Sequence, residues 1–133
     1  MLDGRYLLHQ RIGGGRSGTV YRATHIALQK TVAVKLLHDG DRLAAHDFAQ
    51  FRTEAEALGR LTHPGIVSVI DFGVDPEAGG TPYLVMEIID GVTLSTWLAE
   101  RGAVDVVEAL PWLRQMADAL DYAHGHGVRH GDL

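Results

Sequence analysis

The chain has 133 residues, of which 46% are hydrophobic and 22% are charged, a composition typical of one globular domain. Its net charge of −5 argues against nucleic acid or an anionic membrane as the main partner. The absence of cysteine excludes disulfides and thiolate metal sites. No apolar run approaches the roughly 18 residues of a membrane span, and the first residues lack a signal-peptide core. We therefore expect a soluble, cytoplasmic chain, with a membrane anchor beyond Leu133 left open.

Strand and turn signals alternate through the first two thirds of the chain. Near-alternating β-branched and aromatic residues, or short apolar runs, favour strands. Glycine, proline and aspartate between such runs indicate turns. These patterns predict five strands, at residues 6–12, 19–25, 31–37, 66–72 and 82–87. We expect them to form a mostly antiparallel sheet with a packed helix.

Helical periodicity marks three other segments. Residues 44–61 predict a helix with Glu54 on the flank of its apolar stripe, and Pro64 ends that helix. A short helix is predicted at residues 93–100, with Thr93 as its N-cap. A longer one is predicted at residues 105–124, where Pro111 indicates a kink or a late start. The apolar stripe of the first helix consists of Phe48, Phe51, Ala55, Leu58 and Leu61.

A glycine-rich loop follows the first predicted strand. Gly13, Gly15 and Gly18 fit the pattern G-x-G-x-x-G-x-V, with Val20 last, and glycine lets a backbone approach phosphate oxygens with no Cβ in the way. Dinucleotide-binding folds share this pattern, but there the loop opens a helix. The residues after Gly18 are a poor helix start, and no lysine follows directly as in a Walker A loop. Taken alone, the loop fits a flexible hairpin turn as well as it fits phosphate binding.

A lysine lies within an otherwise apolar strand. Lys35 shares a strand face with Ala33, because side chains in a strand alternate. The small alanine leaves room for a flat base there, and the ammonium can reach phosphates. A buried ammonium needs an anion, which Glu54 can supply. Considered alone, Lys35 is better explained as a strand-edge lysine reaching water and Glu54 as solvated. The glycine loop before Lys35 and the glutamate after it favour the paired arrangement.

The sequence closes on His130-Gly131-Asp132-Leu133. A carboxylate just after a buried helix can orient a hydroxyl nucleophile and accept its proton, which makes Asp132 a candidate base. The plain alternative is a flexible tail. His124, His126 and His130 invite a metal interpretation, but their spacing matches no known zinc pattern. We therefore expect no metal site on these residues.

Together, and in this order, these motifs resemble a eukaryotic-type (Hanks-type) Ser/Thr protein kinase of the kind found in bacteria. The resemblance covers residues 6–133 and implies an α+β, protein-kinase-like fold. A five-stranded antiparallel N-lobe sheet with the αC helix would occupy residues 6–87, the hinge 88–92, and the first helices of the C-lobe, αD and αE, 93–133. Besides the glycine loop, the resemblance rests on Val32-Ala33-Val34-Lys35, Phe51-Arg52-Thr53-Glu54-Ala55, His63-Pro64-Gly65-Ile66-Val67, Tyr83-Leu84-Val85-Met86-Glu87 and Asp90-Gly91-Val92-Thr93-Leu94.

The resemblance implies that ATP and Mg²⁺ are used and assigns roles to individual residues. Lys35 would hold the α- and β-phosphates and pair with Glu54 of the αC helix. Asp132 would be the catalytic-loop aspartate, and Met86 would be the gatekeeper behind the base. The remaining nucleotide-binding residues would be Ile12, Gly13, Gly14, Gly15, Gly18, Val20, Ala33, Glu87, Ile89 and Asp90.

Around the base the implied contacts are of three kinds. Ile12, Val20 and Ala33 would sandwich the adenine ring between apolar side chains. Glu87 and Ile89 would offer hinge backbone groups to its edge. Asp90 would lie near the ribose.

Two features depart from the family pattern. Gly131 stands where the family usually has an arginine that meets a phosphorylated activation loop.

His-Gly-Asp is also the form found in aminoglycoside- and choline-kinase-like phosphotransferases, so a small-molecule kinase is the runner-up. The complete glycine loop and the His63-Pro64-Gly65 stretch count against it. A non-catalytic nucleotide-binding pseudokinase remnant is a further alternative, against which Lys35, Glu54 and Asp132 argue.

The second departure is where the sequence stops. The family binds Mg²⁺ through an Asn five positions after the catalytic Asp and through the Asp of Asp-Phe-Gly. Both would lie beyond Leu133, as would most of the C-lobe. We therefore expect these 133 residues to be inactive by themselves and to expose an apolar patch.

Overall fold

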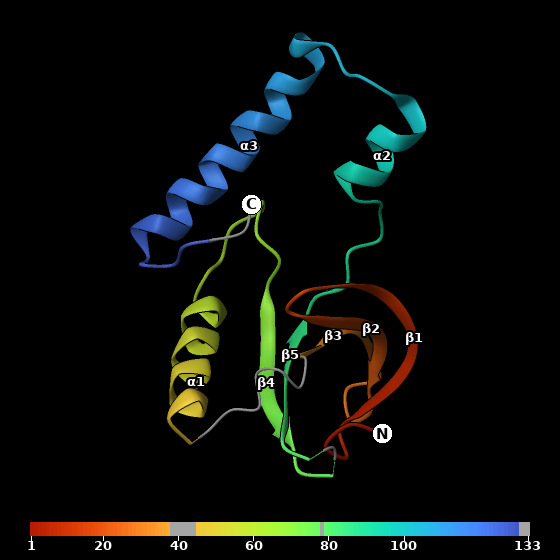
Figure 1. The fold of residues 1–133 in the computed structure, drawn as a ribbon, viewed down its shortest axis with the longest axis vertical. Coiled ribbons are helices and arrows are strands. Elements are labelled where there is room, and N and C mark those ends of the chain that lie inside the picture. Colours follow the sequence, from red (N-terminus) through yellow and green to blue (C-terminus); the bar gives the residue numbers. More distant parts are fainter. Residues whose placement is uncertain (38–44, 78, 131–133) are drawn as a thin grey trace.

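A computed structural model describes residues 1–37, 45–77 and 79–130, which form an antiparallel sheet followed by helices (Figure 1). The strand order is β1-β2-β3-β5-β4, with every pair of neighbours antiparallel. This confirms the expected five-stranded antiparallel sheet. The strands are β1 (Tyr6–Gly15), β2 (Gly18–His25), β3 (Lys30–Leu37), β4 (Val69–Asp75) and β5 (Thr81–Met86).

Three helices accompany the sheet. Helix α1 (Ala45–Gly59) lies beside β4, whereas α2 (Leu94–Arg101) and α3 (Val106–Gly125) lie beyond one end of the sheet (Figure 1). The Thr93 hydroxyl accepts a hydrogen bond from the Thr96 N–H at 3.1 Å, so its predicted role as an N-cap is confirmed.

Helix α3 does not start late at Pro111, which was one of the two outcomes expected there, the other being a kink. The Asp105 carboxylate accepts a hydrogen bond from the Val107 N–H at 2.7 Å and caps the helix. The helix therefore begins at Val106 and runs through Pro111. A late start after the proline is wrong, because the aspartate cap satisfies the first turn upstream of it.

Element boundaries also differ from the sequence pattern, and the larger shifts are in β1, β4 and α1. Strand β1 continues to Gly15, because pairing with β2 reaches the tip of the hairpin. Strand β4 begins only at Val69, since the Ile66 N–H donates to the carbonyl of His63 in a turn instead of to a neighbouring strand. Helix α1 ends at Gly59 rather than two residues later.

Strand register divides the central strands into two faces. Val20 and Lys35 are direct cross-strand partners, and Lys35 in turn faces Leu84. Ala33, two positions from Lys35, faces Met86. Cross-strand partners share a face and side chains alternate along a strand, so these residues all lie on one face. The opposite face holds the core cluster of Leu2, Tyr6, Ala23, Val32, Val34, Tyr83 and Val85.

Helix α1 packs on the face that carries Lys35. The Phe51 side chain is buried and meets Phe72 edge-on, with ring centroids 6.0 Å apart. Phe72 faces Leu84, the cross-strand partner of Lys35, so all three lie on the same face of the sheet. Burying Phe51 and Ala55 there removes apolar surface from water and fixes the helix against β4.

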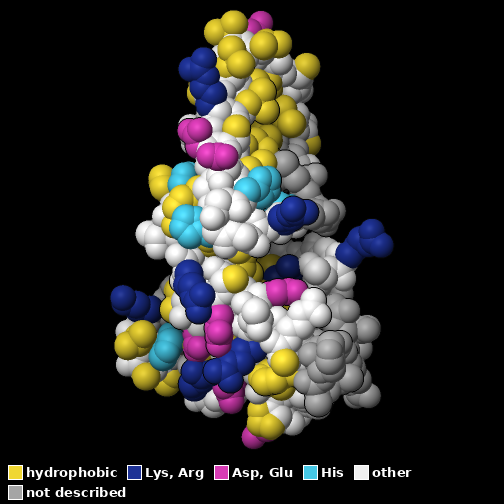
Figure 2. All heavy atoms as spheres, turned by 90° about the vertical axis from the view of Figure 1, so that its left-hand side faces the viewer, with side chains coloured by type: hydrophobic (Ala, Val, Ile, Leu, Met, Phe, Trp, Pro, Cys, Tyr) yellow, Lys and Arg dark blue, Asp and Glu magenta, His cyan; other side chains and the backbone are white. Residues whose placement is uncertain are grey.

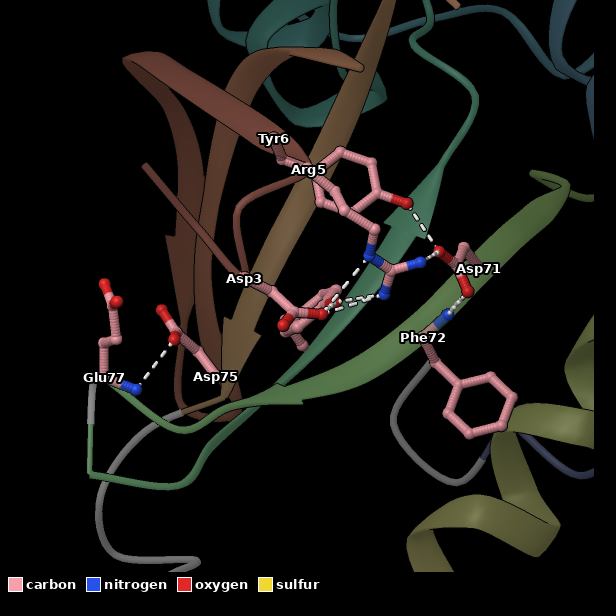
Figure 3. Close-up of polar contacts among 8 residues, drawn as sticks. Asp3, Arg5, Tyr6, Asp71, Phe72, Asp75 and Glu77 are labelled. Atoms are coloured by element: carbon pink, nitrogen blue, oxygen red, sulfur yellow. Dashed lines mark hydrogen bonds and ion pairs between the residues drawn. The ribbon is translucent and has the colours of Figure 1, made fainter. Parts of the chain in front are cut away.

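A polar network ties the N-terminal residues to the far strands of the sheet (Figure 3). Arg5 donates from Nη1 to Asp71 Oδ2 at 2.7 Å and from Nη2 to Asp3 Oδ2 at 2.9 Å. The Tyr83 hydroxyl donates to Asp3 Oδ2 at 2.6 Å and accepts from Arg5 at 2.7 Å. The Tyr6 hydroxyl donates to Asp71 Oδ2 at 2.5 Å. Each buried tyrosine hydroxyl therefore has a carboxylate partner.

The network should make the fold sensitive to alkaline pH. Burial, and then the hydrogen bond to Asp3, raise the pKa of Tyr83 to about 12. Since an unfolded tyrosine titrates near pH 10, the unfolded chain loses this proton first. The contribution of Tyr83 to stability is therefore fully present below pH 10 and is lost as the pH rises toward 12. Denaturant melts between pH 8 and 12 should show this loss.

Variants identify the source of that alkaline loss. Tyr83→Phe should flatten the decline of unfolding free energy above pH 10, whereas Tyr21→Phe, outside the network, should leave it unchanged. Burial and the hydrogen bond to Asp71 also raise the pKa of Tyr6, so Tyr6→Phe should flatten the decline as well. An alkaline decline that is the same in all four proteins would contradict the assignment.

An aromatic stack joins the loop after α1 to the end of α3. The Tyr122 hydroxyl accepts a hydrogen bond from the Thr62 N–H at 3.1 Å. The Tyr122 ring lies 5.1 Å from the His63 ring and 4.2 Å from the His126 ring, measured between centroids. Gly65 lets this loop approach α3, because a Cβ there would lie 3.1 Å from the Cβ of Ala119. These contacts place α3 against the end of the sheet.

Helices α2 and α3 leave apolar surface in water, which confirms the predicted patch. Val106 and Val107 are 71% and 77% exposed, and Figure 2 shows hydrophobic side chains gathered at the upper end of the molecule, over the first turns of α3. A groove of about 450 Å³ between the helices is lined by Gly65, Val92, Thr93, Leu94, Trp97, Trp112, Gln115 and Met116. Within the part of the chain described here, no helix is long and apolar enough to cross a membrane.

Candidate functional site

The glycine loop forms the hairpin between β1 and β2, with Arg16 and Ser17 as its turn. None of the loop glycines has a positive φ, so the room around each of them is the property to compare. A Cβ on Gly18 would clash with the carbonyl oxygen of Leu36, whereas one on Gly15 would meet nothing within 4 Å. Gly18 therefore permits close packing against β3, and Gly15 leaves open room at the loop.

Lys35 reaches toward this hairpin. It lies in β3 directly opposite Val20 and is half-buried. Its Nζ donates a hydrogen bond to Ser17 Oγ at 2.8 Å. The ammonium is therefore placed beside the glycine loop, where it can neutralise an anion bound under the hairpin.

The expected pairing of Lys35 with Glu54 is not formed in this structure. Glu54 is exposed on α1, and its Oε1 accepts a hydrogen bond from Gln50 Nε2 at 2.9 Å, one helical turn earlier. Among the ion pairs between described residues, none joins Lys35 to Glu54. Lys35 lies on the sheet face that α1 covers, but it is bonded to Ser17, and Glu54 is bonded to Gln50.

Of the apolar residues expected around the adenine ring, Val20 and Ala33 lie on the face of the sheet that carries Lys35. Ala33 is buried and faces Met86 across the β3–β5 pair, on the face that also carries Val20. Ile12 within β1 is 45% exposed and Ile89 after β5 is 62% exposed. Exposed apolar side chains around a small buried alanine are consistent with a surface that a flat ring covers.

The segment after β5 is fixed at its start. The Glu87 N–H donates to the Ser68 carbonyl at 3.0 Å, and Glu87 Oε1 accepts from the Ser68 N–H at 2.8 Å. The Glu87 N–H is therefore engaged within the chain. Further along, Asp90 Oδ1 lies 3.9 Å from Arg22 Nη1, which brings the segment after β5 close to the middle of β2.

Asp132, the candidate base, and Gly131 lie outside the described residues. No group of three or more His, Cys, Asp or Glu side chains that could hold a metal ion occurs in the described ranges. Sequence reasoning missed Ser17, whose contact with Lys35 spans 18 positions, and the Arg22–Asp90 ion pair. A hydroxyl at the tip of a glycine hairpin was the available signal for Ser17.

The glycine hairpin, the half-buried lysine and the antiparallel sheet define the class of this protein. The family model described as "Protein kinase domain" matches residues 6–133, so the chain belongs to the protein kinase family. This agrees with the kinase-like fold expected from the sequence motifs.

The relatives it resembles are bacterial. The chain is 37% identical over 130 residues to the serine/threonine-protein kinase Pkn1 of Myxococcus xanthus, covering 98% of this chain and 18% of Pkn1. It is 35% identical over 132 residues to the serine/threonine-protein kinase PrkC of Bacillus subtilis (strain 168), covering 99% of this chain and 20% of PrkC. The chain thus spans about a fifth of the length of these relatives.

Solved kinase domains share the fold. A crystal structure of the Mycobacterium tuberculosis PknI kinase domain superimposes with a TM-score of 0.84 at 29% identity. The superposition covers all of this chain and 53% of the PknI chain. The described elements accordingly correspond to the N-lobe and the early C-lobe of a kinase domain.

Proposed function

We propose that the complete protein carrying these residues transfers the γ-phosphoryl group of ATP to Ser or Thr hydroxyls of proteins. The observation that carries the proposal is the arrangement of Lys35 under the glycine hairpin, with open room at Gly15. The family and the named activities of the relatives support the same reaction. We place this domain in the cytoplasm, where ATP is available.

In this proposal Lys35 binds the α- and β-phosphates, and backbone N–H groups of the glycine hairpin donate to phosphate oxygens. Gly13, Gly14, Gly15 and Gly18 keep Cβ atoms out of that space. Lys35 contributes by charge neutralisation and by fixing the position of the phosphates, because phosphoryl transfer needs little covalent help from the protein. On phosphate binding, Glu54 would turn from Gln50 to the lysine and hold it.

The adenine ring of ATP would lie between Ile12, Val20 and Ala33, with Met86 behind it. The Glu87 N–H is bonded to Ser68, so we propose that Glu87 offers its carbonyl oxygen and that Ile89 supplies the N–H.

Two groups complete the proposed reaction. Asp90 would bind the ribose once its side chain leaves Arg22. Asp132 would orient the substrate hydroxyl and accept its proton.

Mg²⁺, which kinases use to neutralise charge on the phosphates, finds no ligand set among the described residues. We therefore propose that its ligands lie outside them and derive no step through it.

The experiment that tests the function is a transfer assay with γ-labelled ATP on the complete protein. A mixed protein substrate should acquire label that is recovered as phosphoserine and phosphothreonine. Aminoglycosides and choline, offered in parallel, should stay unlabelled. Label on either small molecule alone would replace the proposal with a small-molecule kinase, and ATP binding without any transfer would favour a non-catalytic nucleotide-binding protein.

A further inference from the structure

The tip of the glycine hairpin closes on the lysine of β3. Ser17 Oγ accepts a hydrogen bond from Lys35 Nζ at 2.8 Å, across 18 positions of sequence. The β2–β3 register supports this contact by placing Val20, just after the turn, opposite Lys35. Gly18 permits it, because a Cβ there would clash with the Leu36 carbonyl oxygen and lie 3.2 Å from Lys35 Cε. The contact is therefore built into the hairpin.

The serine oxygen accepts a hydrogen bond from the ammonium that a phosphate oxygen could otherwise accept. An ammonium has three N–H donors and no acceptor, and Ser17 takes one of them. Glu54, which the family pattern would place on the lysine, is bonded to Gln50 instead. Among the described residues, the loop tip rather than α1 thus holds the ammonium.

We propose that Ser17 is a latch on Lys35 that nucleotide phosphates must displace, so that this serine sets the affinity of the site for phosphate-bearing nucleotides. The inference rests on the proposed function, because it takes Lys35 as the phosphate-binding group. Ser17 is a positioning residue that acts through Lys35. Releasing it frees both the ammonium and the loop tip for the phosphates.

Nucleotide titrations of the complete protein and of two variants of it test the latch. Ser17→Ala should tighten binding of ATP about fivefold, which corresponds to about 1 kcal/mol, the net contribution of one ordinary exposed hydrogen bond. Ser17→Thr keeps a hydroxyl and should bind ATP like the parent chain. Adenosine carries no phosphate and does not compete with Ser17, so its affinity should be the same in all three. That difference between ligands separates a latch from a general effect on the fold.

A second measurement examines Lys35 without any nucleotide. Lys30 begins the same strand and is exposed, so in a ¹⁵N spectrum of the side-chain ammonium groups of the complete protein it is an internal control for Lys35. Ammonium protons of Lys35 should exchange with water more slowly than those of Lys30 in the parent chain and in Ser17→Thr. In Ser17→Ala the two lysines should exchange alike.

The outcomes separate the latch from the proposed function. ATP binding that is equal or weaker in Ser17→Ala overturns the latch alone, and so does unchanged Lys35 exchange in that variant. If Lys35 exchange responds to Ser17→Ala but the parent chain binds no ATP, nucleotide binding by this chain is refuted, and the affinity role of Ser17 with it. In that case the contact between Ser17 and Lys35 still stands.

Discussion

Replacing Lys35 with methionine is expected to lower kcat/KM for protein phosphorylation by at least about 100-fold in the complete protein. Methionine has a similar length but no charge, so the phosphates lose their cation while β3 keeps an apolar side chain. Steady-state assays with labelled ATP measure the loss. The melting temperature should change little, because Lys35 is only half-buried and its hydrogen bond to Ser17 is exposed.

Lys30→Met is the matched control for this prediction. Lys30 begins the same strand but is exposed, at the end of β3 away from the glycine hairpin. Its replacement removes the same charge from the chain and should leave kcat/KM within about twofold. Retained turnover in Lys35→Met, or an equal loss in both variants, would contradict the assignment of Lys35 to the phosphates.

The second large effect is expected at Asp71, where the polar network meets β4. Asp71→Ala should lower the free energy of unfolding by about 2 kcal/mol, because it leaves the buried Tyr6 hydroxyl without its acceptor. It also removes one of the two carboxylate partners of Arg5, a smaller loss, since that ion pair is partly exposed and Asp3 remains. Chemical denaturation at pH 7 measures the change.

A double-mutant cycle shows whether the hydroxyl is the cause. If the unpaired Tyr6 oxygen carries most of the cost, Tyr6→Phe combined with Asp71→Ala should be less destabilised than the two single losses added together. Purely additive losses would mean that the two residues stabilise the fold independently. Asp90→Ala, which changes an 86%-exposed carboxylate, serves as a control and should cost little.

Local patterns in the sequence predicted the framework of this site well. The β3 segment alternates Val32 and Val34 with Ala33 and Lys35, and the structure buries the valines in the core cluster and turns Lys35 to the other face. Such alternation is a property of a few adjacent residues, so one sequence is sufficient to detect it.

Contacts between residues that are distant in the sequence could not be predicted from such local patterns. The bond from Tyr6 to Asp71 spans 65 positions and that from Lys35 to Ser17 spans 18. No local periodicity encodes which side chains meet across a sheet. The expected pair of Lys35 with Glu54 is not formed in this structure and remains a prediction, because an apolar stripe orients a helix face but does not set the distance of that face from β3.

The two tryptophans of the chain give its two halves separate optical signatures. Trp97 of α2 and Trp112 of α3 meet edge-on with centroids 5.0 Å apart, and Arg101 lies over Trp97. The sheet contains tyrosine but no tryptophan. Within these residues, indole emission therefore reports on the α2–α3 pair, whereas tyrosine emission comes mainly from the sheet, which holds three of the four tyrosines. Comparing the two signals during unfolding reveals whether the halves melt together or in sequence.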